Sequence, residues 1–600
     1  MNKAATRLLL VAPAGSGKTE VLVRRIERVL AESPNEAFRI LGVTYTVKAS
    51  EELRTRLAAT VSTEAWRVDC ETLHGFALEW LMRYGRTVGI GPNVVVYSDD
   101  ADRMSLIADY IRSLGLDKMI GDDLRETVGP IIRAIDDHRT LSPHLPVADI
   151  KFLGVDLSEL YDAYTSALTR AGGIDFPGML TKLIESFQVD PWVLQNFQST
   201  YREILVDEGQ DLTPAQTQVL RLLAGPGVNL FVVADERQSI NNFAGGSFDN
   251  ALAVVGPEHL RLTLQHNFRC STSILSAAES IAAHMKSRPM ETLTAPGAPP
   301  GKVTVVSATN QSDEARIVKE WVQQLLSNGL EPHTLAKGED PRLQPEDIAV
   351  IARTRWILDP FIAALNEAEL KVSFNLEPSG FLQTSMGRLF LDALALLADK
   401  SDKPAYRRFV EELGALGVVS TAETPVEALA NSSSEELVAL AAGLRLADDP
   451  ARLDTLLSTL SRTLAHSDWW DDARAIEQLW LNYRAATDMH QRTVKGFLRF
   501  VARSQMAKAS DPGIRVLTIH RVKGLEFRAV AIVGAREGAL PDYRARTSTE
   551  LDAERRGLYV AMTRAQRALH ISWSQTTIDR QKRVHRENPS QFLRQAGLVE

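Results

Sequence analysis

Near its start the sequence carries a glycine-rich segment of a kind that binds phosphate. It follows an apolar run at residues 8–12 and leads into a stretch with helical spacing, and it consists of Ala12, Pro13, Ala14, Gly15, Ser16, Gly17, Lys18 and Thr19. The glycines let the backbone turn so that its N–H groups surround phosphate oxygens, and the helix N-terminus adds a favourable dipole. We therefore expect Lys18 to pair with the β- and γ-phosphates and Thr19 to bind Mg²⁺. The strict pattern has glycine at the first position, where this chain has Ala12.

Two adjacent carboxylates, Asp207 and Glu208, follow a second apolar run at residues 204–206. In doubly wound sheets, ligands bind at the carboxyl ends of the strands. Phosphoryl transfer to water needs a carboxylate near the metal and a group that orients the nucleophile. Asp207 fits the metal role and Glu208 the water-activating role. Such a pair is often only a solvated turn, so this prediction depends on the phosphate loop.

The elements that must position these residues follow an α/β pattern. Short apolar runs, typical of strands buried on both faces of a parallel sheet, alternate with helical segments. The first set of expected strands is at residues 7–12, 40–44, 204–206, 229–233 and 260–264, and the second set is at 303–306, 348–351, 514–518, 530–533 and 569–573. Two mainly helical stretches, at about 86–190 and 380–508, interrupt the two sets.

Composition narrows the class of protein. The chain has 600 residues, more than the ~250–300 that one core accommodates. Its only cysteines, Cys70 and Cys270, exclude a disulfide framework and a four-cysteine metal site, which fits a reducing cytoplasm. No apolar run reaches the ~18–20 residues of a membrane span, so we expect no membrane contact. The net charge of −8 argues only weakly against nucleic acid binding, because a large enzyme can be basic in one groove.

Several segments, in the right order, resemble motifs of the UvrD/Rep/PcrA family of superfamily 1 helicases. They are LGVTYTVKA at 41–49, TLHGF at 72–76, VADERQSI at 233–240, LQHNFR at 264–269, VLTIHRVKGLEF at 516–527 and ERRGLYVAMTRA at 554–565. The resemblance implies an α/β fold with two RecA-like P-loop NTPase cores, each a parallel sheet flanked by helices and interrupted by a mainly helical insertion. We expect the first core at 1–85 and 191–268, its insertion at 86–190, the second core at 269–379 and 509–600, and its insertion at 380–508.

The resemblance also implies roles for residues around ATP and Mg²⁺. Gln238 would sense the γ-phosphate, and Arg269 and Arg564 would reach the same phosphate. Phe268 would stack on the base and Glu526 would contact the ribose. Arginines on the γ-phosphate stabilise charge in the transition state and make closure of the cores depend on that phosphate.

In the family, other matching segments face single-stranded DNA. Aromatic rings can stack on bases without sequence preference, and polar side chains can contact the backbone. The residues carried over are Thr44, Tyr45, Lys48, Thr72, His74, Phe76, Phe243 and His520. Each aromatic ring, taken singly, is more often packed in a core, but the placement of these rings in family DNA segments favours stacking.

The chain departs from the family pattern in several places. Asn241 replaces an aromatic residue and Ala244 replaces an arginine, so the grip on DNA is in question there. No glutamine occurs among the seventeen residues before Lys18, which leaves the preference for ATP open. The stretch 380–508 has no clear helix-hairpin-helix signature. Since 36 residues follow Arg564, we expect any nuclease activity to come from a partner chain.

The leading hypothesis is an ATP-dependent 3′–5′ helicase or translocase on single-stranded DNA, acting in DNA repair, replication or recombination. The alternative is a translocase with little unwinding that clears proteins from DNA or serves a partner nuclease, as in an anti-phage complex. A nucleotide-gated scaffold without turnover is disfavoured, because the catalytic residues occur together. We expect single-stranded and tailed duplex DNA as partners, with a possible nuclease or repair protein, in a bacterial or phage-like cytoplasm, as a monomer or DNA-induced dimer.

Overall fold

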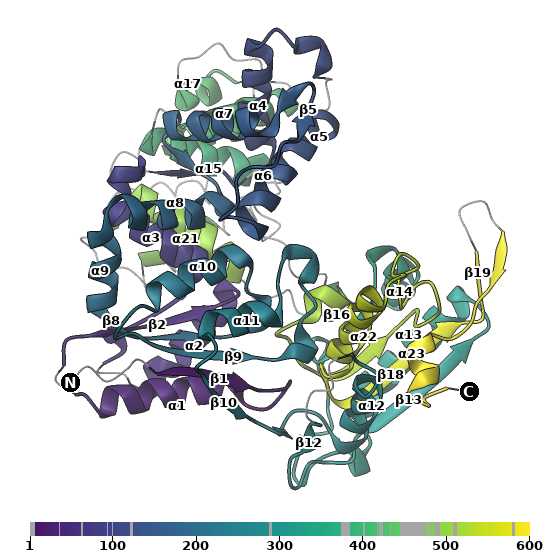
Figure 1. The fold of residues 1–600 in the computed structure, drawn as a ribbon. Coiled ribbons are helices and arrows are strands. Elements are labelled where there is room, and N and C mark those ends of the chain that lie inside the picture. The colour runs from purple at the N-terminus through teal and green to yellow at the C-terminus, as the bar shows by residue number, and fades with distance from the viewer. Residues whose placement is uncertain are drawn as a thin grey trace.

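A computed structural model gives the fold of most of the chain (Figure 1). It describes residues 6–34, 36–61, 64–92, 94–98, 100–120, 124–286, 291–373, 385–399, 402–416, 418, 424–432, 434–444, 476–477, 479–481, 483–484, 492–507, 513–578 and 583–599. Much of the helical stretch predicted at 380–508 therefore lies outside the described residues.

The first core is a six-stranded sheet in which every pairing is parallel. Its strands, in spatial order, are β10 (Leu260–Thr263), β1 (Arg7–Val11), β9 (Asn229–Ala234), β8 (Tyr201–Val206), β2 (Arg39–Thr44) and β3 (Val68–Thr72). The central strands are buried on both faces, as their unbroken apolar sequences predict. Because all strands run the same way, their carboxyl ends meet at one edge, where the phosphate loop and the carboxylates emerge.

The second core repeats this architecture. Its six parallel strands, in spatial order, are β13 (Lys302–Ala308), β18 (Ala565–Ser574), β17 (Phe527–Ile532), β14 (Ile348–Ala352), β16 (Ile514–Thr518) and β15 (Val372–Ser373). Helices α13 (Gln311–Asn328) and α14 (Arg355–Glu367) share a hydrophobic cluster with one set of strand side chains. Helices α12 (Thr272–Ala282) and α22 (Ser548–Met562) share the cluster made by the other set. The prediction of an α/β fold with two parallel sheets flanked by helices is confirmed.

Helices also cover both faces of the first sheet. Helix α1 (Lys18–Ala31) buries Leu22, Ile26 and Leu30, the helically spaced side expected from the sequence. The opposite cluster contains α3 (Leu73–Tyr84), α8 (Phe176–Val189), α10 (Pro214–Leu223) and α11 (Phe248–Val255). Helix α8 thus packs with the first core, although its residues fall inside the stretch 86–190 that we predicted as the insertion.

The two insertions lie against each other beside the first core. Helices α4 (Asp100–Ser113), α6 (Gly129–Leu141) and α7 (Leu157–Arg170) form one cluster, and α15 (Ser385–Ala398), α16 (Lys403–Ala415) and α21 (Val494–Ala507) belong to another. In Figure 1 the green helices of the second insertion stand next to the blue helices of the first, away from the second core. No described helix is long and apolar enough to cross a membrane.

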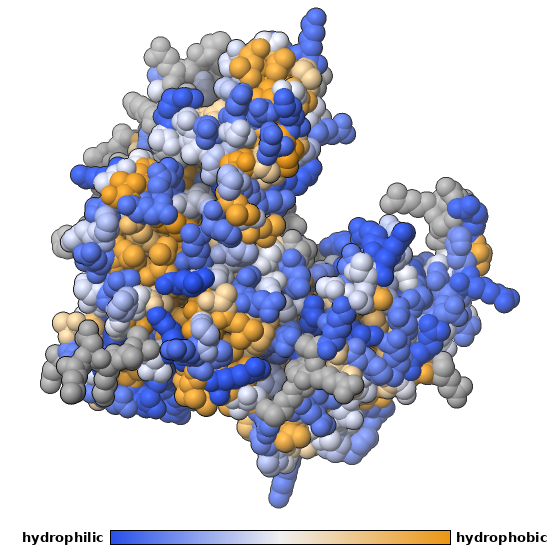
Figure 2. Space-filling model, viewed as in Figure 1, coloured by the Kyte–Doolittle hydropathy of each residue, from blue (hydrophilic) through white to orange (hydrophobic). Residues whose placement is uncertain are grey.

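The surface between these parts is hollowed. Figure 2 shows a concave region between the column of the first core with its insertions and the second core. The visible face of the second core is mostly hydrophilic, whereas apolar patches are scattered over the column.

Candidate nucleotide and DNA site

The phosphate loop connects β1 to α1 in the strand–loop–helix order that phosphate binding requires. Gly15 and Gly17 have φ values of 68° and 85°, in the left-handed region where only glycine is unstrained. A Cβ atom added at Gly15 would lie 2.7 Å from the Cβ of Arg269, so this glycine also permits close approach of a second segment. Ser16 Oγ donates to Pro13 O at 2.7 Å, which holds the turn closed.

Lys18 lies at the first turn of α1 with its ammonium group buried. Its Nζ is 3.4 Å from Glu208 Oε1 and has no hydrogen-bond partner among the residues that the structure describes. Burial alone would lower the pKa of Lys18, but the nearby carboxylates of Glu208, Asp235 and Asp207 outweigh burial and raise it. A buried cation with unused donors suits an anionic ligand with several oxygens, such as a phosphate chain.

Asp207 and Glu208 stand where β8 ends, as predicted. Glu208 has a φ of 52°, a left-handed conformation that costs a non-glycine residue roughly 1–3 kcal/mol and is typical of functional sites. Burial and the neighbouring Glu208 raise the pKa of Asp207 to about 6. Burial acts the same way on Glu208, but Lys18 and Lys523 prevail and lower its pKa to about 2. The hard oxygens of Asp207 and of Thr19, at the start of α1, are the donors that Mg²⁺ prefers.

A buried amide connects this carboxylate pair to the next strand. Gln210 donates from Nε2 to Glu208 Oε2, and its Oε1 accepts from the backbone N–H of Asp235 at 2.8 Å. Asp235 Oδ2 in turn accepts from Gln238 Nε2 at 2.6 Å. The segments after β8 and β9 are therefore linked through one chain of hydrogen bonds, which ends at Gln238.

Arg564 from the second core completes this chain. Its Nη2 donates to Gln238 Oε1 at 3.1 Å, and its Nε and Nη1 donate to Val560 O and Leu525 O at 3.0 and 3.1 Å. The side chain is fully buried, and burial together with the charge of Arg269 lowers its pKa to about 10. The two residues that sequence analysis predicted on the γ-phosphate from different cores, Gln238 and Arg564, are thus in direct contact.

The segment after β10 crosses from the first core to the second and closes over the phosphate loop. Asn267 is fully buried; its Nδ2 donates to Ala14 O at 2.7 Å and its Oδ1 accepts from Arg269 N at 2.9 Å. Arg269 Nε is 2.7 Å from Glu526 Oε2, which joins two predicted ATP ligands. Phe268 is 70% exposed, so its ring is available to a base. Sequence analysis missed the role of Asn267, although it lies inside a quoted motif.

Lys523 was also missed, and it links the cores directly. Its Nζ lies 2.5 Å from Asp211 Oδ2, donates to Gln238 O at 2.8 Å and is 4.0 Å from Glu208 Oε2. Asp211 is buried, and its Oδ1 accepts from Asn241 Nδ2 at 3.0 Å. The asparagine that departs from the family pattern therefore has a structural task here, since it fixes the carboxylate that Lys523 binds.

The candidate DNA residues of the first core follow β2 and β3 at the carboxyl edge of the sheet. Tyr45 is 45% exposed and Lys48 is exposed, so both can reach a ligand. Thr44 is buried and donates to Thr46 O at 3.0 Å. The hydroxyl of Thr72 accepts from Gly75 N at 3.1 Å and so caps α3. These two threonines shape the loops in this conformation.

Phe76 is only 5% exposed and packs among Trp80, Phe197 and Tyr201, so the expectation that it stacks on a base is wrong for this conformation. The side chain of Phe243 lies outside the described residues.

His74 is partly buried and faces the ring of Phe176 edge-on, with 6.2 Å between centroids. Burial lowers the pKa of His74 to about 4, so it is neutral at ordinary pH and would contact DNA as a hydrogen-bonding group without charge. Phe176, at the start of α8, is 39% exposed and is an aromatic neighbour that no sequence motif indicated.

In the second core, His520 lies just after β16 in the turn η12 (Ile519–Val522). Burial and Arg353 lower its pKa, while Glu554 opposes them. Arg353, after the neighbouring strand β14, is held by Glu554 through a 2.6 Å ion pair. His520 is thus a neutral, partly exposed group at the carboxyl edge of the second sheet, in the position equivalent to the candidate DNA loops of the first.

Two domain families match the sequence, one after the other. Residues 1–256 match the UvrD/REP helicase N-terminal domain, and residues 262–441 and 458–576 match the UvrD-like helicase C-terminal domain. The boundary between the two matches falls at residues 256–262, by strand β10 of the first sheet and shortly before the segment that crosses to the second core.

Named relatives align along almost the whole chain. The ATP-dependent DNA helicase PcrA of Leuconostoc citreum is 28% identical over 94% of this chain and 79% of its own length. DNA helicase II of Escherichia coli (strain K12) is 27% identical over 98% of this chain and 85% of its own length. The ATP-dependent DNA helicase UvrD1 of Mycobacterium tuberculosis (strain ATCC 25618 / H37Rv) is 27% identical over 98% of this chain and 83% of its own length.

Proposed function

The chain belongs to the UvrD-like helicase family and is an ATP-hydrolysing DNA helicase, and from this premise we propose that it moves 3′→5′ along single-stranded DNA and separates strands as it moves. The polarity rests on the family resemblance. The observation that carries the motor mechanism is the contact of Arg564 with Gln238, which ties the second core to the nucleotide site of the first.

ATP is proposed to bind with its phosphates on the loop 12–19 and its base against Phe268. Lys18 then pairs with the phosphates, while Asp207 and Thr19 hold Mg²⁺, which neutralises phosphate charge when bound. Glu208 accepts a proton from the attacking water. Its lowered pKa keeps the carboxylate ionised, and the hydrogen bond that Gln210 donates holds it in place. Arg269 and Arg564 stabilise the charge that develops on the γ-phosphoryl group.

The same contacts make the gap between the cores respond to hydrolysis. While the γ-phosphate is present, it supplies negative charge that draws Arg564 and Arg269 toward Lys18. When that phosphate leaves, the cations Lys18, Arg269 and Arg564 repel one another, and the cores are free to shift. Each cycle then alternates closed and open arrangements, which gives a step along DNA.

The DNA path is proposed along the carboxyl edges of the two sheets. The first core offers Tyr45, Lys48 and His74. The second core offers His520 together with two exposed rings, Trp356 after β14 and Tyr543 in the loop after β17, which are 55% and 69% exposed. Exposed rings of this size on soluble surfaces are typical of stacking platforms for unpaired bases.

Two measurements test this proposal. The rate of ATP hydrolysis should rise when single-stranded DNA is added, and a duplex with a 3′ tail should be unwound in preference to one with a 5′ tail. Stimulated hydrolysis with translocation but without strand separation would favour the alternative of a translocase that clears proteins or serves a partner nuclease. An ATPase rate that does not respond to DNA would overturn the motor interpretation.

A further inference from the structure

Arg237 precedes the sensor Gln238 in the turn η5 (Glu236–Gln238), yet its side chain reaches into the second core. Its Nη1 lies 2.5 Å from Glu279 Oε1 and donates to Thr292 Oγ1 at 2.9 Å and to the hydroxyl of Tyr559 at 3.4 Å. The guanidinium carbon stands 5.6 Å from the centre of the Tyr559 ring. The arginine is 3% exposed, and the carboxylate of Glu279 in the second core is its ion-pair partner.

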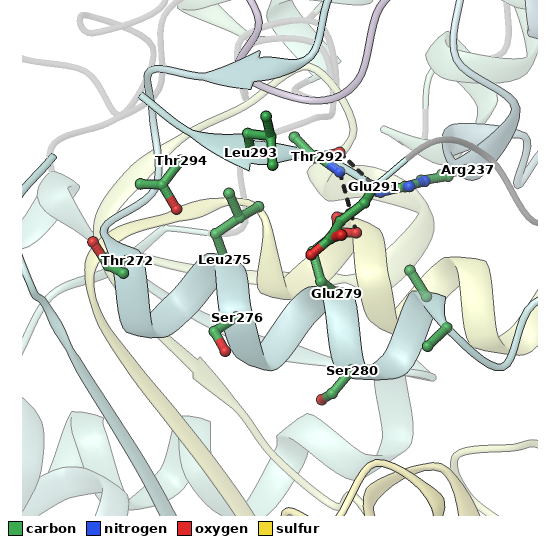
Figure 3. Close-up of a pocket in the computed structure, with 12 residues that line it drawn as sticks. Arg237, Thr272, Leu275, Ser276, Glu279, Ser280, Glu291, Thr292, Leu293 and Thr294 are labelled. Atoms are coloured by element: carbon green, nitrogen blue, oxygen red, sulfur yellow. Dashed lines mark hydrogen bonds and ion pairs between the residues drawn. The ribbon is translucent and has the colours of Figure 1, made fainter. Parts of the chain in front are cut away.

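The partners of Arg237 are themselves held in place. Glu279 projects from α12, and its Oε2 accepts from Thr292 N at 3.3 Å, while Tyr559 is buried in α22. Figure 3 shows Arg237, Thr292 and Glu279 joined by these interactions on the wall of an open cavity of about 690 Å³. The cavity is lined, apart from Arg237, by residues of the second core, so the ion pair lies where the turn η5 of the first core contacts α12 of the second.

The rest of the sensor segment is docked on the second core as well. Ser239 O accepts from Arg556 Nε at 2.8 Å, and Ile240 packs in the same hydrophobic cluster as α12 and α22. Gln238, between Arg237 and these residues, faces the other way, toward Asp235 and Arg564. One three-residue turn thus presents its sensor to the nucleotide and its neighbouring arginine to the second core.

We propose that Arg237 is a positioning residue that couples the two cores through its ion pair with Glu279. This inference rests on the proposed function, because it takes Gln238 to be the γ-phosphate sensor. Arg237 and Gln238 are adjacent in one turn, so a displacement of the sensor when the γ-phosphate leaves also displaces the guanidinium. That displacement pulls on Glu279 and Tyr559, and hence on helices α12 and α22.

An ion pair suits this place because Arg237 and Glu279 resist being separated. A buried arginine without its carboxylate is strongly destabilised, so the pair resists separation more than an apolar contact does. Arg237 also fixes three partners with one planar group, which a lysine cannot reproduce. A small movement of the turn that carries Gln238 is therefore passed through the ion pair to α12.

The test compares hydrolysis with and without single-stranded DNA in the full chain. The variants are Arg237→Lys, Glu279→Gln and the reversed pair Arg237→Glu/Glu279→Arg, with thermal unfolding as a check on folding. Each single variant should lower the DNA stimulation, the ratio of the two rates, by at least about 5-fold, the lower bound typical of a coupling between sites. The basal rate and the KM for ATP should stay within about twofold, and the reversed pair should recover most of the ratio.

A matched control separates coupling from general loss of stability. Arg25 and Glu203 form an ion pair of 2.6 Å inside the first core, and the Glu203 side chain is 1% exposed. Glu203→Gln removes a similar buried charge without touching the contact between the cores, so its stimulation ratio should stay at the wild-type value. The inference is overturned if Arg237→Lys and Glu279→Gln keep the wild-type ratio, or if they lower basal and stimulated rates equally. A wild-type chain that lacks DNA stimulation would instead contradict the proposed function itself.

Discussion

The guanidinium of Arg564 donates a hydrogen bond to the side-chain oxygen of Gln238 at 3.1 Å, although the two residues belong to different cores. The other nitrogens of the same guanidinium bind carbonyls of its own core. Protein groups of both cores therefore hold the orientation of the guanidinium, and donors fixed in this way need little reorganisation during a reaction.

The first prediction concerns the orientation of the Arg564 guanidinium. Arg564→Lys keeps a positive charge but cannot bind Gln238 Oε1, Val560 O and Leu525 O with one planar group. We expect DNA-stimulated kcat to fall by roughly 10³-fold, the lower range for loss of an arginine at a transferring phosphoryl group. Binding of a fluorescent ATP analogue should weaken far less. A kcat within tenfold of the wild type would mean that Arg564 does not act on the phosphoryl group.

The second prediction separates binding from chemistry in the first core. Lys18→Ala removes the cation that we propose to pair with the phosphates, so both ATP binding and hydrolysis should be lost. Glu208→Gln keeps the shape and removes the base, so ATP should still bind while the rate falls by ~10²–10⁴-fold. Equilibrium binding and steady-state hydrolysis, measured on the same preparations, distinguish these outcomes. Robust turnover in either variant would contradict the assignment of the site.

The third prediction concerns the ion pair of Lys523 with Asp211. Lys523→Met leaves the buried carboxylate of Asp211 without its cation, which typically costs ~3–5 kcal/mol. The apparent Tm should fall, and the second change Asp211→Asn should restore much of it, because no buried charge is then unpaired. If Lys523→Met unfolds at the wild-type temperature, the pair does not hold the cores together in solution.

The strands that hold the site could largely be predicted from sequence, because buried parallel strands have continuous apolar runs. Strand β3 was missed, since Asp69 and Glu71 interrupt its apolar pattern. The structure explains the interruption: β3 is an edge strand, and Asp69 pairs with Arg39 on the neighbouring β2 at 2.5 Å. Edge strands are exposed along one side, so their composition carries a weaker signal.

Residues that act through distant partners were the hardest to predict. Asn267 and Lys523 lie within recognised motifs, but their partners Ala14 and Asp211 are far away in the chain, so local spacing could not reveal the contacts. The error at Phe76 has the same origin. Its neighbours Phe197 and Tyr201 come from beyond the first insertion, and only the folded core places them around its ring.

The fourth prediction concerns Phe268, whose backbone N–H donates to Gly15 O at 2.8 Å while its ring stays exposed. Phe268→Ala should weaken nucleotide binding by ~1–3 kcal/mol, the usual worth of stacking a base on an aromatic ring. Every base has a flat face, so the loss should be similar for ATP, GTP and CTP. Phe268→Trp should retain binding. A loss confined to ATP would indicate that this segment reads adenine specifically.

The fifth prediction concerns the contact between the insertions, where Asp102 of α4 accepts hydrogen bonds from Arg407 and Arg408 of α16. Asp102 is 4% exposed, and Asp102→Asn should weaken the contact by ~1.5–3 kcal/mol, the usual worth of a hydrogen bond to a charged group. Spin labels at Ser113→Cys and Val438→Cys, on exposed positions of the two insertions, would report the change as a broader distance distribution.

Labelling at these positions should be selective, because both native cysteines are buried. Burial raises the pKa of Cys70 to about 12 and also raises that of Cys270, so neither thiol forms the reactive thiolate near pH 8. Arg388→Gln is the matched control, since it breaks a 2.7 Å ion pair with Glu412 inside the second insertion alone. An unchanged distance distribution in Asp102→Asn, or an equal change in Arg388→Gln, would show that Asp102 does not set the arrangement of the insertions.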